Sequence, residues 1–346
     1  MDKILAGSAK HLELVGGLKD LEYLMLNLQF RCNYSCLGCC NSNREISKKG
    51  TPLSLEKISS LIDEAKDLGM RVVVIAGEGE PFLDKRIDTI IGEIYYAGLI
   101  PYIFTNGSLL NKERAQFLKE HNASLVIQLN SLNKDTYEKL SCKAGSFDIV
   151  IDNLENIRNV FSDTYSTIGN YGLRRIAINA VISSVNLDEL FVKGFNIDGK
   201  FIKCFICGEE PDIFEPLKDF CGNDFALVYN SLMRIGKASS DENFEDIEEI
   251  KVRIRESSKN SFPLGTISSG QWCAYMRNGI SVGAGGDILT CAYSLESAGK
   301  LGNIREGVLR KYFGIANSAV DKFYEQNVHN RCILRHLYYK EFIHGL

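Results

Sequence analysis

The chain has 346 residues, of which 45% are hydrophobic and 24% charged, and these fractions indicate a folded globular protein rather than a disordered one. Its 40 basic and 44 acidic residues give a net charge of −4, which offers no cationic surface for a nucleic-acid backbone. The N-terminus lacks an apolar signal segment, and the longest uncharged stretch, residues 94–111, contains turn residues that do not suit a bilayer span. We therefore expect a cytoplasmic protein with no nucleic-acid or membrane partner.

Up to about residue 207, short β-rich runs alternate with helical patterns. Ser54 is a typical helix N-cap, and the apolar residues after it recur at helical spacing until Gly69. Alternation of this kind predicts parallel strands joined by right-handed crossovers. The predicted strands are 23–30, 72–76, 102–105, 125–129, 175–182 and 201–204, and further helices are predicted at 87–94, 148–161 and 186–195. Six such units predict an α/β fold, a partial (β/α)6 TIM-like barrel.

The organisation of the chain changes after residue 207, where the hydrophobic period becomes less regular. We expect an N-terminal extension over residues 1–21, the barrel over 22–207, and a linker or helical segment over 208–270. Residues 271–346 carry three cysteines and several glycines and predict a small second domain.

Eleven cysteines are the unusual feature of the composition. In a reducing compartment they are either buried small side chains or metal ligands, and their spacing decides between the two. Cys32, Cys36 and Cys39 form a CxxxCxxC directly after the first predicted strand. Three thiolates in one loop can hold three irons of a 4Fe–4S cube, which leaves the fourth iron open to a chelating ligand. A zinc site would need a fourth Cys or His nearby, and a chance cluster of buried thiols is the other alternative.

This CxxxCxxC resembles the signature of radical S-adenosylmethionine (radical SAM) enzymes, and the resemblance covers about residues 22–207. Residues 77–81 (GEGEP) are similar to the family's GGEP motif, with Glu78 in place of its first glycine. Thr105-Asn106-Gly107 is similar to the family's TNG segment, and residues 128–131 lie where the family carries a ribose-contacting group. The resemblance implies S-adenosylmethionine contacts from Gly79, Glu80, Pro81, Thr105, Asn106, Asn130 and Ser131.

The resemblance also implies a mechanism. S-adenosylmethionine would chelate the open iron, and reductive cleavage would give a 5′-deoxyadenosyl radical that abstracts hydrogen from an unactivated C–H bond. A flavodoxin- or ferredoxin-type protein is the expected electron donor. No catalytic residue beyond the cofactor sites is assigned from the sequence.

A second cysteine set lies near the C-terminus, at Cys273, Cys291 and Cys332. The first two, with Gly286 between them, resemble the opening of the SPASM and Twitch domains, which carry auxiliary 4Fe–4S clusters. Gly285-Gly286 is expected to form a hairpin turn that brings Cys291 back beside Cys273. The chain lacks the further cysteines of a full SPASM domain, so the resemblance implies a Twitch-like domain with a second 4Fe–4S cluster.

The fourth ligand of that auxiliary cluster is left open. Arg335 stands where a last cysteine is usual, and a guanidinium has no lone pair to give. Cys204, Cys207 and Cys221 could supply the missing thiol, could form a separate site, or could be packed thiols. A histidine beside Cys332, or a vacancy filled by solvent or substrate, is the other possibility.

The expected function is a radical SAM oxidoreductase or related enzyme acting on a small polar metabolite. The alternative is modification of a ribosomal peptide, which we weigh less because only about 22 residues precede the first predicted strand. A non-catalytic iron–sulfur electron carrier is the third hypothesis. A pure carrier has no use for an S-adenosylmethionine pocket, so the GEGEP and TNG segments argue against it.

Overall fold

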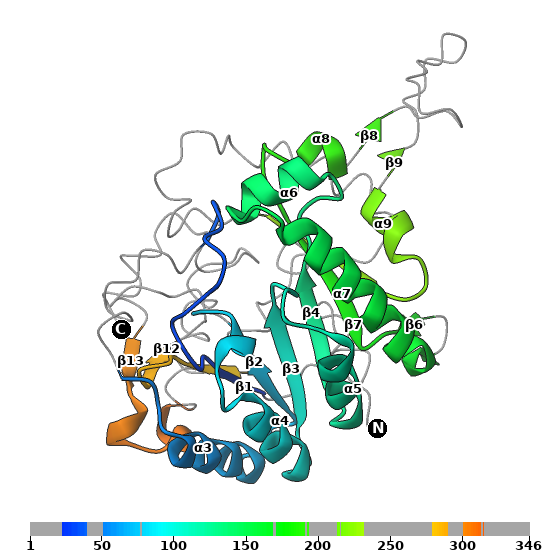
Figure 1. Ribbon diagram of the computed structural model, residues 1–346. Helices are drawn as coiled ribbons and strands as arrows, with labels where there is room; N and C mark the ends of the chain where they lie inside the picture. The colour runs from blue at the N-terminus through cyan, green and yellow to red at the C-terminus, as the bar shows by residue number, and fades with distance from the viewer. Residues whose placement is uncertain are drawn as a thin grey trace, which may run out of the picture.

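The computed structural model of the protein describes residues 23–39, 51–76, 78–168, 171–190, 192–193, 213–214, 216–231, 279–289, 300–312 and 314. Its centre is a nine-stranded sheet in the order β10-β7-β4-β3-β2-β1-β11-β12-β13 (Figure 1). In chain order, the first six parallel strands are β1 (Tyr23–Leu26), β2 (Val72–Ile75), β3 (Ile100–Thr105), β4 (Ser124–Gln128), β7 (Ile176–Ile182) and β10 (Ala226–Ser231). The predicted α/β fold with a parallel sheet is therefore confirmed.

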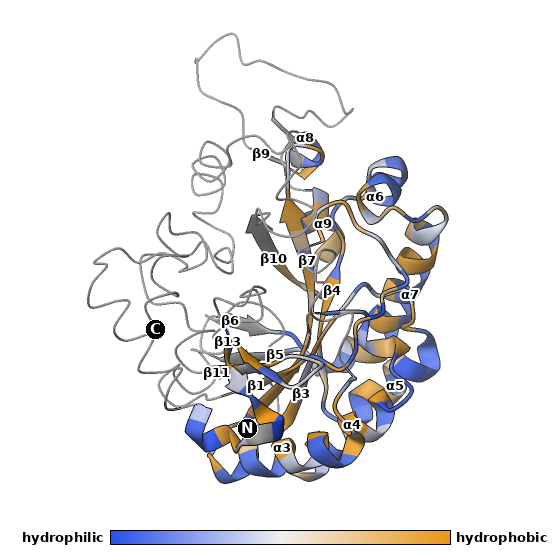
Figure 2. Cartoon of the chain, turned by 90° about the vertical axis from the view of Figure 1, so that its left-hand side faces the viewer, coloured by the Kyte–Doolittle hydropathy of each residue, from blue (hydrophilic) through white to orange (hydrophobic). Residues whose placement is uncertain are grey.

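Most of the helices that connect these strands lie along one face of the sheet (Figures 1 and 2). They are α3 (Leu55–Asp67), α4 (Ile87–Tyr96), α5 (Lys112–Glu120), α6 (Lys134–Ser141), α7 (Ser146–Phe161), α8 (Leu187–Leu190) and α9 (Pro216–Cys221), with 3-10 turns η2 (Pro81–Leu83), η3 (Ser162–Thr164) and η7 (Ile304–Glu306). Ser54 caps α3 as predicted, because its side chain accepts a hydrogen bond from the backbone N–H of Lys57.

Two apolar layers follow from the alternation of side chains along the strands. Leu24, Leu26 and the other residues of one phase pack against the helices in the main core. The opposite phase, with Tyr23, Met25 and Tyr102 among its members, forms a second cluster on the face without these helices. We call this second face the inner face of the sheet, because it corresponds to the lumen of a partial barrel.

A C-terminal segment extends the sheet beyond β1. Strand β11 (Gly279–Val282) pairs with β1 in parallel, and β12 (Asp287–Leu289) and β13 (Lys300–Asn303) continue the sheet in antiparallel fashion. The predicted hairpin turn at Gly285-Gly286 is confirmed, since β11 and β12 flank it. Two small hairpins complete the described elements: β5 (Ser166–Ile168) with β6 (Tyr171–Leu173), and β8 (Val192–Lys193) with β9 (Ile213–Phe214).

The structure differs from the sequence analysis at the end of the barrel. The strand beside β7 is β10, from the segment that was expected to be a linker, whereas the strand predicted at 201–204 lies outside the described residues. The helix predicted at 186–195 is wrong in length, because α8 has only four residues. Asn186 ends the preceding turn with side-chain bonds to the carbonyls of Asn130 and Val181. None of the helices in the described part combines the length and hydrophobicity of a membrane-spanning segment.

Candidate active site

The motif residues meet at one edge of the sheet. The cysteine loop follows β1, Glu78 to Pro81 follow β2, Asn106 follows β3, and Asn130 follows β4. Because these strands are parallel, their carboxyl ends lie together, where α/β proteins place their ligand sites. Gly77, the first residue of the GEGEP segment, lies outside the described residues.

The cysteine loop is held by the end of helix α6. The backbone N–H of Leu37 donates to the carbonyl of Leu140 at 2.9 Å, and that of Ser35 donates to the carbonyl of Ser141 at 3.3 Å. Cys36 and Cys39 are half-buried, Cys32 is exposed, and all three are free thiols. A loop anchored in this way presents its three sulfur atoms from a fixed backbone.

The three thiols share one electrostatic environment. Burial raises the pKa of Cys36 to about 12, and the charges of Cys39 and Cys32 add to the shift. Although the surface of Cys32 is exposed, the surrounding protein atoms partly exclude water from its thiol, and this desolvation raises the pKa of Cys32; Glu80 and Cys39 add to the shift, whereas donors from Tyr34 and Asn106 oppose it. Nearby positive charge, which iron ions supply, would therefore favour the ionised thiolates of Cys32 and Cys36.

The three thiols can be compared with the donor sets of metal sites by their number and type. No three potential ligands among the described residues gather around one metal ion. In an iron–sulfur cube each cysteine binds a different iron, so the sulfurs stand further apart than around a mononuclear ion. Three thiols from one loop, each free to bind a different iron, have the chemistry of the ligands at three corners of a 4Fe–4S cluster.

The carboxylate of Glu80 accepts several hydrogen bonds within the site. Glu80 is 2% exposed, and its carboxylate accepts hydrogen bonds from the hydroxyl of Thr105 (2.7 Å) and the backbone N–H groups of Asn106 (2.9 Å) and Phe82 (3.2 Å). Burial raises the pKa of Glu80, and the same three donors act in the opposite direction. Three of about four acceptor positions are thus filled by the protein, which leaves one on Oε2.

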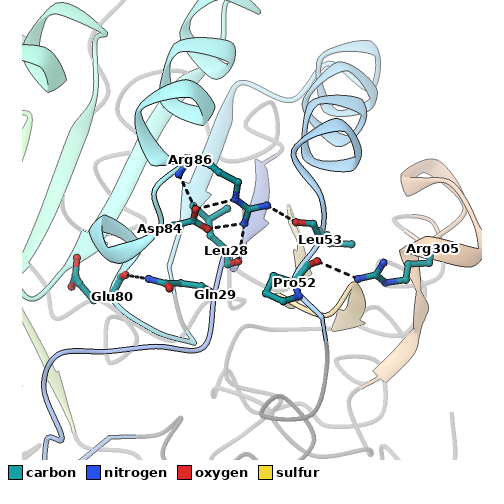
Figure 3. Close-up of polar contacts among 8 residues, drawn as sticks. All are labelled: Leu28, Gln29, Pro52, Leu53, Glu80, Asp84, Arg86 and Arg305. Carbon is teal, nitrogen blue, oxygen red and sulfur yellow. Dashed lines mark hydrogen bonds and ion pairs between the residues drawn. The ribbon is translucent and has the colours of Figure 1, made fainter.

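The GEGEP segment also lies directly against the cysteine loop. The N–H of Glu80 donates to the carbonyl of Arg31 at 2.8 Å, and Gln29 Nε2 donates to the carbonyl of Glu80 at 2.5 Å (Figure 3). A Cβ atom on Gly79 would lie 2.2 Å from the oxygen of Arg31. Only glycine permits this approach. The close contact therefore gives a steric reason for the glycine at position 79, which the segment shares with the GGEP motif.

The TNG segment is tied to the cysteine loop by a pair of asparagines. Asn106 Nδ2 donates to Asn33 Oδ1 at 2.8 Å, and Asn33 Nδ2 donates to the Ser108 hydroxyl at 2.8 Å. Gly107 has φ +79°, and a Cβ atom there would lie 2.8 Å from a methyl group of Ile127. Sequence reasoning missed Asn33, although its place beside Cys32 inside the motif was the available signal.

The base of the site is held by an ion pair that the sequence analysis did not find. Arg86 contacts both carboxylate oxygens of Asp84 and donates to the carbonyls of Leu53 (2.6 Å) and Leu28 (3.4 Å) (Figure 3). Burial acts to raise the pKa of Asp84, yet the hydrogen bonds and charge of Arg86 lower it overall. Arg305 reaches residues 51–52 from the C-terminal segment, with Nη2 2.7 Å from the carbonyl of Thr51.

A chain of amides fixes Asn130. Asn179 Nδ2 donates to Gln128 Oε1 at 2.8 Å, and Gln128 Nε2 donates to Asn130 Oδ1. Asn130 Oδ1 also accepts the backbone N–H of Val181 at 2.9 Å. The oxygen of Asn130 is therefore engaged, so its amide nitrogen is the group that can face a ligand as a donor.

Ser131 differs from its neighbour because it is fully buried. Its hydroxyl donates to the carboxylate of Glu189 and accepts the N–H of Asn133. Thr136 donates to the other oxygen of Glu189 at 2.6 Å, so Glu189 joins α6 to the β4 loop.

Of the remaining predicted ligands, Cys221 is the one that lies within the described residues. Cys273, Cys291 and Cys332, as well as Cys204 and Cys207, lie outside the described residues. Cys221 ends α9 in the main apolar core with 2% exposure, and burial raises its pKa to about 12. In that position Cys221 packs as a small apolar side chain.

Comparison with known proteins identifies a family model and relatives that resemble the part of the chain with this site. Residues 26–182 match the model of the Radical SAM superfamily. A Fe-coproporphyrin III synthase from Methanosarcina barkeri is 31% identical over 131 residues, which cover 38% of this chain and 32% of the relative. A GTP 3′,8-cyclase from Desulforamulus reducens is 33% identical over 138 residues, which cover 38% of this chain and 41% of the relative. The chain thus spans less than half the length of these two relatives.

Solved structures share the fold over a larger part of the chain. The anSMEcpe structure with bound AdoMet superposes with a TM-score of 0.61 and 15% identity, covering 92% of this chain and 87% of its own. Streptococcus suis SuiB bound to S-adenosylmethionine superposes with a TM-score of 0.59 and 18% identity, covering 89% and 72%. Enzymes of this superfamily use a 4Fe–4S cluster and S-adenosylmethionine. The Radical SAM model thus matches residues 26–182, the segment that carries the cysteine loop, and the solved structures share the fold of this segment.

Proposed function

We propose that the protein is a radical SAM enzyme that uses S-adenosylmethionine to abstract hydrogen from an organic substrate. The observation that carries the proposal is the convergence of Cys32, Cys36 and Cys39 with Glu80 and Asn106 at one edge of the sheet. When bound, the cluster and S-adenosylmethionine supply a 5′-deoxyadenosyl radical as the hydrogen-abstracting species. A flavodoxin- or ferredoxin-type protein remains the expected electron donor.

The residues of the chain have distinct roles in this proposal. The three cysteines hold the cluster, and the remaining acceptor position of Glu80 together with the backbone of Gly79 and Glu80 receives the ammonium group of S-adenosylmethionine. The amide nitrogen of Asn130, oriented by Gln128 and Asn179, donates to a ribose oxygen. The bond between Asn106 and Asn33 holds the TNG segment against the cysteine loop. Gly79, Pro81 and Thr105 shape the pocket, and Ser131 supports it through Glu189.

A small polar metabolite is the proposed substrate class. Curated relatives matched over the barrel include enzymes named for GTP and for Fe-coproporphyrin III, which are not peptides. A peptide substrate is the second candidate, because one similar fold is that of SuiB bound to its precursor peptide SuiA. An electron carrier without turnover is disfavoured, since the contacts that order Glu80 and Asn130 serve no purpose in a carrier.

An auxiliary 4Fe–4S cluster on Cys273, Cys291 and Cys332 in a Twitch-like domain is part of the proposal. The β11–β12 hairpin supports it, because its turn lies where the resemblance expects the strand pair between the first two cysteines. Full reconstitution should then give about eight irons per chain, four for each cluster.

The test is to replace Cys32, Cys36 and Cys39 together by Ala and to measure 5′-deoxyadenosine after anaerobic reconstitution and reduction. We expect its formation to be abolished, with about half of the iron retained if the auxiliary cluster forms. Cys142→Ala is the matched control, since this exposed thiol follows α6 beside the same loop. Unchanged 5′-deoxyadenosine formation in the triple variant would contradict the proposed function.

A further inference from the structure

The two glutamates of the GEGEP segment point to opposite sides of β2. Glu80 is bonded to Thr105 and Asn106, which follow β3. Glu78, by contrast, places its Oε1 atom 3.0 Å from the position that a Cβ atom of Gly283 would occupy, at the end of β11. Glu78 is 8% exposed, and the missing side chain of Gly283 makes room for its carboxylate. Glu78 therefore lies away from the group of donors that orders Glu80.

Two further buried oxygens lie on the strands next to Glu78. The backbone N–H and the side-chain Nδ2 of Asn27 both donate to the carbonyl of Val282 at 2.9 Å, which engages the donor side of its amide. Among the described residues, neither Asn27 Oδ1 nor Ser281 Oγ has a hydrogen-bond partner, although the two residues are only 4% and 3% exposed. Buried polar atoms are almost always paired, so a group from outside the described protein is expected beside them.

These side chains occupy the same face of the sheet. Ser281 is the register partner of Met25, and Met25 belongs to the inner-face cluster. Asn27 follows Met25 by two residues, so strand alternation places it on the inner face as well. Gly283 follows Ser281 by two residues, and Glu78 Oε1 approaches the position of its Cβ atom, so the carboxylate of Glu78 lies on this face as well. We call Asn27, Glu78 and Ser281 the acceptor cluster, because each offers an oxygen that can accept a hydrogen bond.

We infer that the acceptor cluster is a substrate subsite that binds a primary ammonium group. An ammonium presents three N–H donors, which matches one carboxylate, one amide oxygen and one hydroxyl oxygen. A neutral hydroxyl group has a single donor and gains less from the negative charge of Glu78. The inference rests on the proposed function, since it places the amine on the inner face beside the S-adenosylmethionine site, and it narrows the substrate to an amine-bearing molecule.

Binding of two amine probes to the reconstituted full-length protein tests this inference. The probes are 1,5-diaminopentane, which represents a small metabolite, and the acetylated tripeptide amide Gly-Lys-Gly, which represents a peptide. The neutral comparison compound is 1,5-pentanediol. Affinity is measured by calorimetry in the presence of S-adenosylmethionine. We expect at least one amine to bind tenfold or more tightly than the diol, and the tighter amine identifies the source of the ammonium.

The variants Glu78→Gln and Ser281→Ala identify the site of binding. We expect Glu78→Gln to weaken amine affinity at least tenfold and Ser281→Ala to weaken it about threefold, whereas the exposed control Glu113→Gln leaves it unchanged. Ser281→Ala removes a single atom, so it keeps the test valid if Glu78→Gln does not fold. Equal amine affinity in wild type and in the foldable variants would overturn the inference, as would amine binding no tighter than diol binding.

The affinity for S-adenosylmethionine separates this inference from the proposed function. Glu78 and Ser281 lie apart from the donors around Glu80, so their variants should bind S-adenosylmethionine as wild type does. If S-adenosylmethionine binds and is cleaved but no amine binds, only the subsite is wrong. If S-adenosylmethionine itself is neither bound nor cleaved by the reconstituted wild type, the proposed function fails regardless of the amine result.

Discussion

Replacing Glu80 by Gln tests the hub of the site with a change of one functional group. The variant keeps the size of the side chain but turns one acceptor oxygen into an NH2 donor. If the NH2 group stands at Oε2, it faces the N–H of Asn106. In the other orientation it faces the Thr105 hydroxyl and the N–H of Phe82. Either orientation loses at least one hydrogen bond to a charged acceptor.

The magnitude follows from the value of such a bond. A hydrogen bond to a charged group contributes about 1.5–3 kcal/mol, so the free energy of unfolding should fall by about that amount in urea denaturation. The remaining acceptor position of Glu80 also loses its charge, and the same 1.5–3 kcal/mol corresponds to roughly a tenfold to hundredfold weaker affinity for S-adenosylmethionine. Calorimetric titration of the reconstituted protein measures that affinity.

Glu64→Gln is the matched control for this prediction. Its carboxylate also accepts a backbone N–H, from Leu309 at 2.6 Å, but on α3, away from the carboxyl edge. We expect this control to lower stability without changing the affinity for S-adenosylmethionine. The reasoning about Glu80 is refuted if Glu80→Gln binds S-adenosylmethionine as wild type does, or if Glu64→Gln weakens binding equally.

Two further predictions concern the support of the site. Arg86→Lys cannot hold both oxygens of Asp84 and the carbonyls of Leu28 and Leu53, so unfolding should require about 1.5–3 kcal/mol less in urea at pH 7. Because the pKa of Asp84 is lowered from 3.8 in the folded state, this stabilisation is complete above about pH 4 and is lost as the pH falls through the folded pKa, so the difference from wild type should shrink there. Cys221→Ala should cost about 1 kcal/mol of stability and leave the iron content unchanged, since its thiol packs in the core; loss of iron in this variant would instead make Cys221 a cluster ligand.

The elements with strong local signals could be predicted from the sequence. The continuous apolar run of β2 and the capped amphipathic stripe of α3 each specify their structure within a few residues. Helices α5 and α6 were missed because they are short and polar, with two and three buried residues. Strand β10 was missed because its sequence gives no indication that it pairs with β7.

The residues of the candidate site likewise separate into those that could be predicted from the sequence and those that could not. The three cysteines and Glu80 stand in recognisable motifs, so spacing alone pointed to them. Gln29, Arg86 and Asn179 act through hydrogen bonds to groups far away in the chain, and those partners become visible only when the strands are aligned. The unpartnered oxygens of Asn27 and Ser281 could not be predicted at all, because the register of β1 with β11 brings them together.

The pairing of β1 with β11 has a consequence for how the protein matures. Strand β1, which leads into the cysteine loop, has β2 on one side and β11 on the other. About 200 residues separate β2 from β11, so a ribosome that adds about 5–20 residues per second needs roughly 10–40 s between the two strands. During this interval β1 is the edge of a growing sheet, and the closure of so long a loop slows folding further. The cysteine loop therefore acquires its final support only after β11 has been synthesised, which favours iron delivery after that stage over delivery to the earlier nascent chain.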